Sequence, residues 1–252
     1  MKVIACYSMK GGVGKTATSV NIAYWAARTG NRTLLIDLDP QGASSFYFKV
    51  SSVRKNWSKR FFDAYEHLVG QIKATEFMNL DIIPAQINFR KFDVMLSQLA
   101  RRKTRLKKVL SGLDKEYDFI VLDCPPSIGH LAEAIFEASH AIFVPVIPST
   151  LSERTFEQLH DFFTQNGYAS KRIVPFFSMV QRQKNMHRNT MERLRRQYKR
   201  FLKVSIPFST DVEKMGEFRG PLDTFAKSRP ANKAYYALWK EMVPIIRRAR
   251  YD

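Results

Sequence analysis

Short apolar runs alternate along the chain with segments in which apolar side chains recur every three or four residues. The runs predict buried β-strands at residues 3–7, 33–36, 80–83, 119–122, 141–146 and 173–177. The periodic segments predict helices at residues 15–28, 89–113, 152–165 and 231–248. Because most strands are apolar without alternation, both faces of the sheet must be covered. The pattern therefore predicts a doubly wound α/β fold, with a mainly parallel sheet and helices on both faces.

This alternation runs through the whole sequence without a repeat, a low-complexity tract or a long linker. We expect one domain over residues 1–252, with a mobile loop at residues 51–58. Cys6 and Cys124 sit at or beside predicted strands and make no disulfide framework, which favours a reducing cytosol. No signal peptide is expected, and no apolar run approaches the roughly 18 residues of a membrane span.

The charge of the chain is strongly positive. Lys and Arg total 41 against 23 Asp and Glu, a formal net charge of +18. A net charge of about 2–8 would already keep a small domain soluble. The excess therefore indicates a polyanionic partner, with nucleic acid favoured over an anionic membrane.

A Gly-rich loop follows the first predicted strand and precedes the first predicted helix. It reads Lys10, Gly11, Gly12, Val13, Gly14, Lys15 and Thr16. Glycines let successive backbone N–H groups converge on phosphate oxygens, and the helix N-terminus adds partial positive charge. This context predicts a phosphate-binding loop in which Lys15 binds the β- and γ-phosphates and Thr16 ligates Mg²⁺.

Carboxylates follow two further predicted strands. Asp37 and Asp39 end the second strand before Pro40, and Asp123 ends an apolar strand in the Walker B arrangement. The carboxyl ends of parallel strands form the crevice in which α/β folds bind ligands. Asp123 is expected to hold a Mg²⁺-bound water, because Mg²⁺ retains much of its hydration.

These motifs together resemble the ParA/MinD/Soj family of deviant P-loop partitioning and positioning ATPases. Met9 stands where the common P-loop has its first glycine, and Lys10 matches the signature lysine of that family. The resemblance implies that Asp39 orients the attacking water and that Asp37 supports the Mg²⁺ shell or the loop. It also implies nucleotide contacts from Ala17 and, in a late Ile-Pro segment beside adenine, from Pro207 and Ser209.

The resemblance implies a molecular switch. ATP would join two subunits into a sandwich in which Lys10 of each subunit reaches the phosphates held by the other. The dimer would bind chromosomal DNA without sequence preference, which places it in the cytoplasm on the nucleoid. An adaptor protein on a cargo, such as a plasmid, a chromosome or a protein compartment, would stimulate hydrolysis.

A basic segment late in the chain is the candidate DNA surface. Its apolar residues from Met191 to Leu202 share one face of a predicted helix that extends to Lys203. The opposite face is cationic, as expected for sequence-independent phosphate contact. The DNA-binding candidates are Arg193, Arg196, Lys199, Arg200 and Lys203, with Arg219 as an extension. A second basic cluster spans residues 101–108, and a third comprises Arg247, Arg248 and Arg250.

Two other function classes stay open. A MinD-like membrane ATPase would use an amphipathic helix near residues 239–248, although Pro244 interrupts that pattern. A metabolic enzyme with the same P-loop would need either cluster-bridging cysteines, which Cys6 and Cys124 do not resemble, or a substrate site that the sequence does not reveal.

Overall fold

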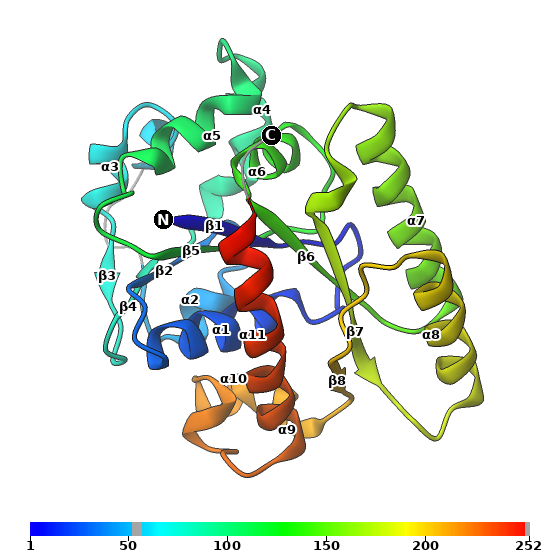
Figure 1. Cartoon of the computed structure of the whole chain (residues 1–252). Coiled ribbons are helices and arrows are strands. Elements are labelled where there is room, and N and C mark those ends of the chain that lie inside the picture. Colours follow the sequence, from blue (N-terminus) through cyan, green and yellow to red (C-terminus); the bar gives the residue numbers. More distant parts are fainter. Residues whose placement is uncertain (52–56, 250–252) are drawn as a thin grey trace.

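The computed structural model describes residues 1–51 and 57–249. Most of the loop predicted at residues 51–58 lies outside the described residues. The described chain forms a single mixed sheet with strand order β3-β4-β2-β5-β1-β6-β7-β8 (Figure 1). The strands are β1 (Lys2–Cys6), β2 (Thr33–Asp37), β3 (Lys73–Ala74), β4 (Leu80–Ile83), β5 (Phe119–Asp123), β6 (Ala141–Val146), β7 (Ile173–Val180) and β8 (Ser205–Pro207).

All neighbouring strands are parallel except β3 and β4, which pair antiparallel. The six predicted strands are confirmed: two match the predicted bounds, and the other four differ by one to three residues at an end. The two strands that the sequence analysis missed, β3 and β8, have only two and three residues. Runs of two or three residues carry no periodic signal in the sequence. These two strands form through pairing with the longer strands β4 and β7.

Helices cover both faces of the sheet, which explains why its strands are apolar throughout. Alternate residues of one strand enter different cores: Leu34 and Ile36 pack on one face, and Leu35 packs on the other. Figure 1 shows α1 and α11 on one side of the central strands and α5 and α6 on the other. The main covering helices are α1 (Lys15–Arg28), α5 (Arg102–Ser111), α6 (His130–Ala138), α7 (Thr150–Gln165), α8 (Asn185–Gln197) and α11 (Pro230–Arg248).

Shorter helices fill the connections. They are α2 (Ala43–Tyr47), α3 (Tyr65–Val69), α4 (Phe92–Ser97), α9 (Thr210–Glu213) and α10 (Met215–Phe218), with 3₁₀ turns η1 (Trp57–Arg60), η2 (Ile87–Lys91), η3 (Ser170–Arg172) and η4 (Leu222–Thr224). The prediction of one helix over residues 89–113 is wrong: η2, α4 and α5 occupy this region instead. Arg101 has a φ of 55°, which a continuous right-handed helix does not allow. The periodicity persists because Leu96 and Leu106, on either side of the break, pack into the same core.

The basic helix predicted to reach Lys203 is also shorter than expected. α8 ends at Gln197, and the chain then turns so that Phe201 and Leu202 pack as core residues outside any helix. The Leu202 amide donates to the Pro175 carbonyl at 2.8 Å, which holds this segment against β7. The helical spacing of the apolar residues therefore identifies which side chains are buried, but it does not give the backbone conformation after Gln197.

The last helix is confirmed over residues 230–248, and it continues through Pro244 instead of stopping there. Of its apolar side chains, Trp239, Met242 and Ile246 are all at most 2% exposed, whereas Val243 and Ile245 are partly exposed. In the described part of the chain, no helix is long and apolar enough to span a bilayer.

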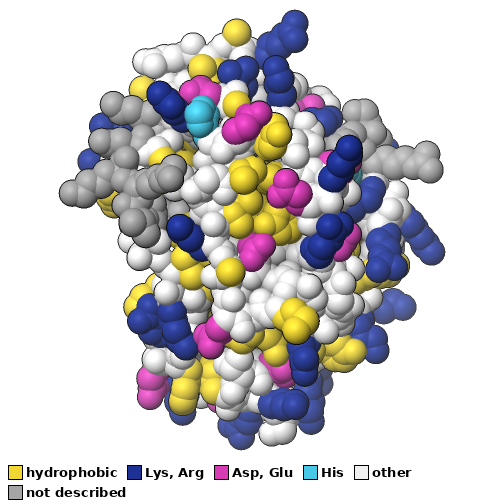
Figure 2. Space-filling model, turned by 90° about the vertical axis from the view of Figure 1, so that its left-hand side faces the viewer, with side chains coloured by type: hydrophobic (Ala, Val, Ile, Leu, Met, Phe, Trp, Pro, Cys, Tyr) yellow, Lys and Arg dark blue, Asp and Glu magenta, His cyan; other side chains and the backbone are white. Residues whose placement is uncertain are grey.

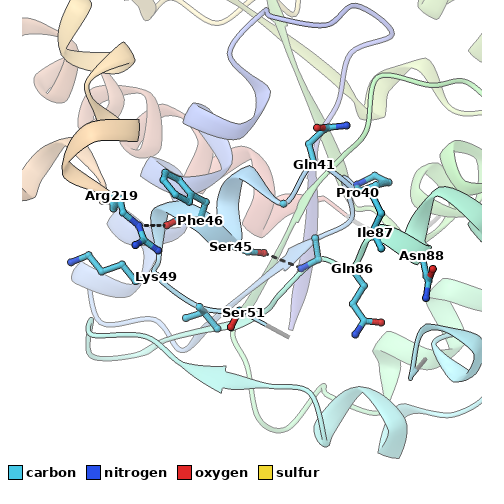
Figure 3. Close-up of a pocket in the computed structure, with 13 residues that line it drawn as sticks. Pro40, Gln41, Ser45, Phe46, Lys49, Ser51, Gln86, Ile87, Asn88 and Arg219 are labelled. Atoms are coloured by element: carbon cyan, nitrogen blue, oxygen red, sulfur yellow. Dashed lines mark hydrogen bonds between the residues drawn. The ribbon is translucent and has the colours of Figure 1, made fainter. Parts of the chain in front are cut away.

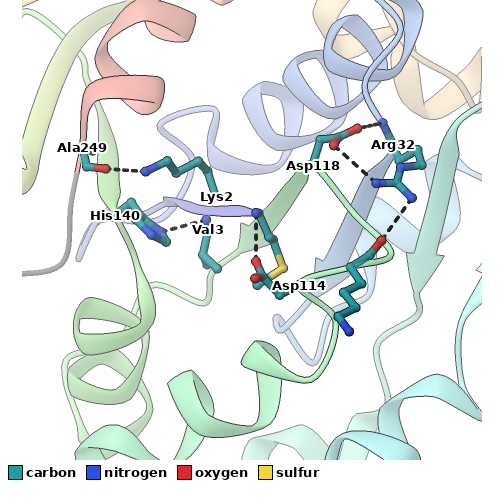
Figure 4. Close-up of polar contacts among 9 residues, drawn as sticks. Lys2, Val3, Arg32, Asp114, Asp118, His140 and Ala249 are labelled. Carbon is teal, nitrogen blue, oxygen red and sulfur yellow. Dashed lines mark hydrogen bonds and ion pairs between the residues drawn. The ribbon is translucent and has the colours of Figure 1, made fainter.

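Polar contacts close the edge of the sheet at which the parallel strands begin (Figure 4). The contacts join Lys2 to the Ala249 carbonyl, the Val3 amide to Nδ1 of His140, and Arg32 to Asp118. The α-amino group also pairs with Asp114 at 2.9 Å. The amino ends of the parallel strands are thus bound to the end of α11, and their carboxyl ends lie at the opposite edge of the sheet.

Candidate functional site: a phosphate loop and two buried carboxylates

The Gly-rich loop connects β1 to α1 at the carboxyl edge of the sheet. Gly12 and Gly14 have φ angles of 68° and 91°, in the region that side chains rarely adopt. A Cβ at Gly14 would also lie 3.1 Å from the Ser178 Oγ on β7. Both observations explain the glycine spacing. α1 begins at Lys15, so the helix N-terminus is at the loop, as the sequence predicts.

The two lysines of the loop make different contacts. Lys15 is only 7% exposed, and its Nζ donates to the Lys10 carbonyl at 3.1 Å, across the loop. The Nζ of Lys10 donates to the Ser152 Oγ at 3.1 Å, in the first turn of α7. Lys10 is therefore held at the surface of its own subunit. Of the other loop residues, Val13 and Ala17 are buried, and Ala17 packs under the loop in the α1 core.

Asp37 and Asp123 meet at the ends of adjacent strands, where they pair in the β2–β5 register. Both are fully buried. Asp123 accepts hydrogen bonds from the Ser19 Oγ at 3.1 Å and from the Ser44 Oγ at 2.6 Å. Asp37 uses only its Oδ2, which accepts from the Ser45 amide and hydroxyl at 2.8 and 2.6 Å.

This pair is electrostatically unsatisfied without a cation. Burial, together with the charge of Asp123, raises the pKa of Asp37 from 3.8 to about 8. Burial likewise raises the pKa of Asp123 to about 6, against hydrogen bonds from Ser44, Thr16 and Ser19 that lower it. The buried Oδ1 of Asp37 has no hydrogen-bond partner among the described residues. Carboxylate oxygens that are buried, close together and not neutralised by a cation are suitable ligands for Mg²⁺.

Asp39 is more exposed than that pair, although its charge contributes, after burial, to raising the pKa of both Asp37 and Asp123. It is only partly buried, and its Oδ1 accepts from the Gln41 amide at 3.0 Å. The Gly42 amide donates to the Asp39 carbonyl at 2.9 Å, so a tight turn fixes this residue at the mouth of the site. The structure thus separates a buried carboxylate, Asp37, from one that solvent can reach.

Sequence reasoning missed the three serines that orient the carboxylates: Ser19, Ser44 and Ser45. Ser45 also accepts the Ala85 amide at 2.9 Å, so it connects Asp37 to the loop after β4. A signal was present, because two adjacent serines follow Gly42 where a helix begins. Hydroxyl side chains in a first turn are usually assigned to capping, and here they serve the carboxylates instead.

A pocket of about 580 Å³ lies at the end of β7, and none of its described lining residues belongs to the Gly-rich loop. Pro207 lines it, together with Gln181 and the half-exposed Phe208. Ser209 is not among the lining residues; its hydroxyl accepts the Asp211 amide at 3.2 Å and caps α9. Of the two residues expected beside adenine, Pro207 therefore lines a pocket and Ser209 does not.

The candidate DNA residues are not equivalent. Arg193 forms a two-point ion pair with Glu153 of α7. Arg200 donates from Nε to the Ile173 carbonyl at 3.3 Å. The exposed side chains of this group on or just after α8 are Arg193, Arg196, Lys199, Arg200 and Lys203. Arg219 does not join them, because it follows α10, which Figure 1 draws on the other side of β8.

In the second basic cluster, on α5, some of the cationic side chains already have partners within the protein. Lys103 pairs with Glu133 at 2.8 Å, and Arg105 donates to the Phe62 carbonyl at 2.7 Å. Figure 2 shows a further face on which Lys and Arg lie mainly at the periphery, around a centre of apolar and acidic side chains. The positive charge is therefore distributed unevenly over the molecule. In the third cluster, Arg250 lies outside the described residues.

A second pocket, of about 740 Å³, opens beside the turn that carries Asp39. Pro40, Gln41 and Gly42 form one wall, and α2 and Arg219 form another (Figure 3). The sequence analysis found no site of this size outside the nucleotide motifs.

Comparison with known proteins places this geometry in a family. A family model described as an AAA domain matches residues 1–172. The chain belongs to this family. It is 40% identical over 147 residues to the sporulation initiation inhibitor protein Soj of Bacillus subtilis, an alignment that covers 58% of each chain. It therefore spans less than two thirds of that relative. The chromosome partitioning protein ParA of Myxococcus xanthus is 27% identical over 255 residues, covering 96% of this chain and 88% of that protein.

Solved structures show the same fold. A putative plasmid partition protein from Borrelia burgdorferi, bound to AMPPNP, has a TM-score of 0.81 and 22% identity, covering 96% of this chain and 98% of that one. Cobyrinic acid a,c-diamide synthase from Mycobacterium smegmatis, with bound ADP and magnesium, has a TM-score of 0.79 and 24% identity, covering 100% and 97%. The resemblance to the ParA/MinD/Soj family and the doubly wound fold are both confirmed.

Proposed function

We propose that this chain is a Mg²⁺-dependent ATPase of the partitioning type, in which ATP controls a monomer–dimer switch. The observation that supports this most directly is the convergence of the phosphate loop with two buried, cation-deficient carboxylates, Asp37 and Asp123. On the same fold, the Borrelia protein binds AMPPNP, and the Mycobacterium protein binds ADP and magnesium. Both support ATP and Mg²⁺ as the ligands here.

Each residue of the site has a role in this proposal. Lys15 leaves the Lys10 carbonyl to bind the β- and γ-phosphates, and loop amides from Gly11 to Thr16 hold their oxygens. Thr16 and Asp123 hold Mg²⁺ and its water, with Asp37 supporting that shell. Mg²⁺ supplies charge neutralisation at the phosphates. Asp39, at the solvent side, orients the water for in-line attack, and most catalysis of this reaction is positioning.

Lys10 gives the switch its two-subunit character. Its ammonium reaches Ser152 on its own subunit, so it stands on the surface and can exchange that hydroxyl for a phosphate held by a second subunit. Binding of ATP then favours the dimer, and hydrolysis removes that preference.

The test is ATP hydrolysis and binding with the purified protein. Lys15→Ala should abolish ATP binding in calorimetry and turnover with it, whereas Lys115→Ala, at an exposed position in the α5–β5 connection, should change neither. If wild-type protein binds ATP in the presence of Mg²⁺ but never hydrolyses it, with DNA or without, the proposed ATPase activity is contradicted. Retained affinity in Lys15→Ala would contradict the assigned loop.

We further propose that the ATP-bound dimer binds nucleoid DNA, without sequence preference, through Arg196, Lys199 and their exposed neighbours, including Lys203. Two such surfaces on one dimer multiply weak phosphate contacts. Arg196→Gln/Lys199→Gln should lower the magnitude of the salt slope of DNA binding by about two, because each phosphate contact contributes about 0.9. Lys115→Gln/Lys233→Gln loses the same charge at other exposed positions and should keep the wild-type slope. Equal slopes in all three proteins would move the DNA site elsewhere.

The alternatives receive less support. A membrane-binding helix would need a face of exposed apolar side chains, but Trp239, Met242 and Ile246 of α11 are buried in the core, which leaves only Val243 and Ile245 partly exposed. An iron–sulfur enzyme would need accessible thiolates. Burial raises the pKa of Cys6 to about 12 and that of Cys124 well above its usual value, and both thiols lie in the core. We therefore retain a cytoplasmic DNA-associated switch that an adaptor protein stimulates.

A further inference from the structure

A third pocket, of about 490 Å³, opens between α8, the end of β7 and the start of β8. Its described lining residues include one acid, Glu192, and four cations: Arg182, Arg188, Arg195 and Lys203. Four cations against one carboxylate give the pocket a strong excess of positive charge. Positive charge gathered in a concave site raises the local concentration of anions.

The four cations of this pocket have no carboxylate partner within the protein. In the described part of the chain, none of their side chains forms an ion pair with Asp or Glu. Other cations of the molecule do form such pairs, as Arg193 does with Glu153 and Lys103 with Glu133. The charges in the pocket are therefore not neutralised internally and can bind an external anion.

Two of the arginines are held in place by contacts that leave donors free for a ligand. The Arg195 guanidinium lies 5.2 Å from the centre of the Phe177 ring, and its Nη2 donates to the Lys203 carbonyl at 3.0 Å. The Nη2 of Arg188 donates to the side chain of Asn185, one turn earlier in α8. Each guanidinium keeps further N–H groups. A side chain that is already fixed loses less conformational entropy when a ligand binds.

The uncharged polar residues of the pocket can also donate hydrogen bonds. His187 is only 4% exposed, and its Nδ1 accepts the Gln181 amide at 3.1 Å. The proton of the neutral ring therefore lies on Nε2, which can donate. The hydroxyl of Ser205 adds another donor. A pocket rich in donors and cations suits a ligand rich in anionic oxygens, as phosphate groups are.

The pocket lies on a different flank of α8 from the arginines assigned to DNA. Arg188, Met191 and Arg195 recur every three or four residues and so share the flank that lines the pocket. Arg193 and Arg196 lie on another flank, and Arg193 contacts α7, against which α8 packs (Figure 1). Of the DNA candidates, only Lys203 is among the described lining residues. A ligand in the pocket can therefore bind without occupying the DNA surface.

The volume and the apolar part of the wall favour a small molecule over a single ion. Small-molecule sites have volumes of about 300–1,000 Å³, and this pocket lies within that range. One phosphate would fill only a fraction of the space and would leave some of the cations without a partner. Val180 and Met191, both largely buried, provide apolar contact beside the cations.

We propose that this pocket binds a small molecule that carries at least two phosphate groups, either as a diphosphate or on separate atoms. Arg188 and Arg195 on α8 bind the phosphates from one side, and Arg182 and Lys203 bind them from the other. The site is additional to the proposed ATPase, because no residue of the phosphate loop is among its described lining residues.

The experiment measures binding of inorganic pyrophosphate by calorimetry at about 0.1 M salt with EDTA. Every protein in this series also carries Lys15→Ala, so that the phosphate loop does not contribute. Arg188→Gln/Arg195→Gln should weaken binding at least about tenfold, because two charged hydrogen bonds are lost. Arg196→Gln/Lys199→Gln loses the same charge outside the pocket and should stay within about twofold of the parent.

A gain of affinity guards against misfolding. Glu192→Gln removes the acid from the pocket and should strengthen pyrophosphate binding about threefold, which an unfolded variant would not show. Three results would each overturn the proposal: no binding to the parent, equal losses in both glutamine pairs, or orthophosphate binding as tightly as pyrophosphate.

Duplex DNA is the other source of phosphates, and a second measurement separates it from a small ligand. With Lys15 intact, Arg188→Gln/Arg195→Gln should keep the salt slope of DNA binding that Arg196→Gln/Lys199→Gln lowers by about two. An equal reduction in the first pair would assign the pocket to the DNA surface and overturn the proposal. Pyrophosphate binding is measured without ATP or DNA, so a failure of the proposed ATPase or DNA binding is recognised separately.

Discussion

Replacing Asp37 by asparagine should stabilise the protein without metal while abolishing ATP hydrolysis. The pKa of this buried carboxyl is raised from 3.8 to about 8, because burial and the neighbouring Asp123 disfavour its charge. At pH 7 the unfolded chain carries the ionised form, whereas the folded protein must take up a proton. This difference costs the folded state at most about 4 kcal/mol at pH 7.

Asparagine removes that cost but introduces a smaller one. Its carbonyl can still accept the Ser45 amide and hydroxyl, which now bind Oδ2. Its NH₂ group takes the place of Oδ1, which has no partner within the described part of the chain. An unsatisfied buried donor costs about 1–3 kcal/mol. The net gain is then about 1–3 kcal/mol, or a rise in Tm of roughly 2–12 °C for a chain of this size.

The assay is thermal unfolding by circular dichroism with EDTA, at pH 5 and pH 7. A carboxyl whose folded pKa lies above its unfolded pKa destabilises the protein increasingly as pH rises between the two values. The advantage of Asp37→Asn should therefore be larger at pH 7 than at pH 5. Asp39→Asn makes the same change at a partly exposed position and should leave Tm unchanged. A gain that is absent at pH 7, or equal at both pH values, would refute the reasoning.

Three other predictions concern the loop, its lysine and the far edge of the sheet. Gly14→Ala should weaken ATP binding in calorimetry at least tenfold, because φ is 91° and the new Cβ approaches Ser178; Gly30→Ala, with a φ of 89° and open space, should cost similar stability but keep ATP affinity. Ser152→Ala frees the Lys10 ammonium and should strengthen ATP-dependent dimerisation about fivefold in light scattering, the equivalent of one hydrogen bond of about 1 kcal/mol; unchanged dimerisation would show that the contact does not restrain Lys10. Burial and the charge of Lys2 lower the pKa of His140 to about 4, so up to about 3 kcal/mol of stability should be lost as pH falls from about 6.5 to 4, and His140→Asn should flatten that part of the urea-unfolding profile.

The sequence predicts the parts of this molecule that are governed by local pattern. The phosphate loop depends on glycines at closely spaced positions, Gly11, Gly12 and Gly14, and the strands of the sheet interior are apolar because helices cover both faces. Local pattern gives the wrong element where a helix ends but the apolar residues keep their helical spacing. Leu96 and Leu106 enter one core from two helices, and Phe201 enters it from a turn.

Pairings between distant segments were also beyond the sequence. Arg193 was assigned to DNA as one cation in a basic run, but its partner Glu153 lies 40 residues away on α7. The serines that orient the carboxylates became visible only once β2, β5 and α2 were brought together. Arg219 was grouped with the basic surface by charge, and the fold places it on Phe46 instead.

The short helix α2 connects the two buried carboxylates to the wall of the pocket beside Asp39. The helix has only five residues, too few to be stable on its own, so its orientation is set by what its side chains bind. At one end, Ser44 and Ser45 bind carboxylates whose charge is compensated when Mg²⁺ is present. At the other, Phe46 is held by the guanidinium of Arg219, which follows α10. α2 also packs against α1, β2 and α10, so both of its ends belong to one packed unit. By thermodynamic linkage, any ligand that this pocket binds more tightly in the presence of ATP and Mg²⁺ must strengthen ATP binding by the same factor.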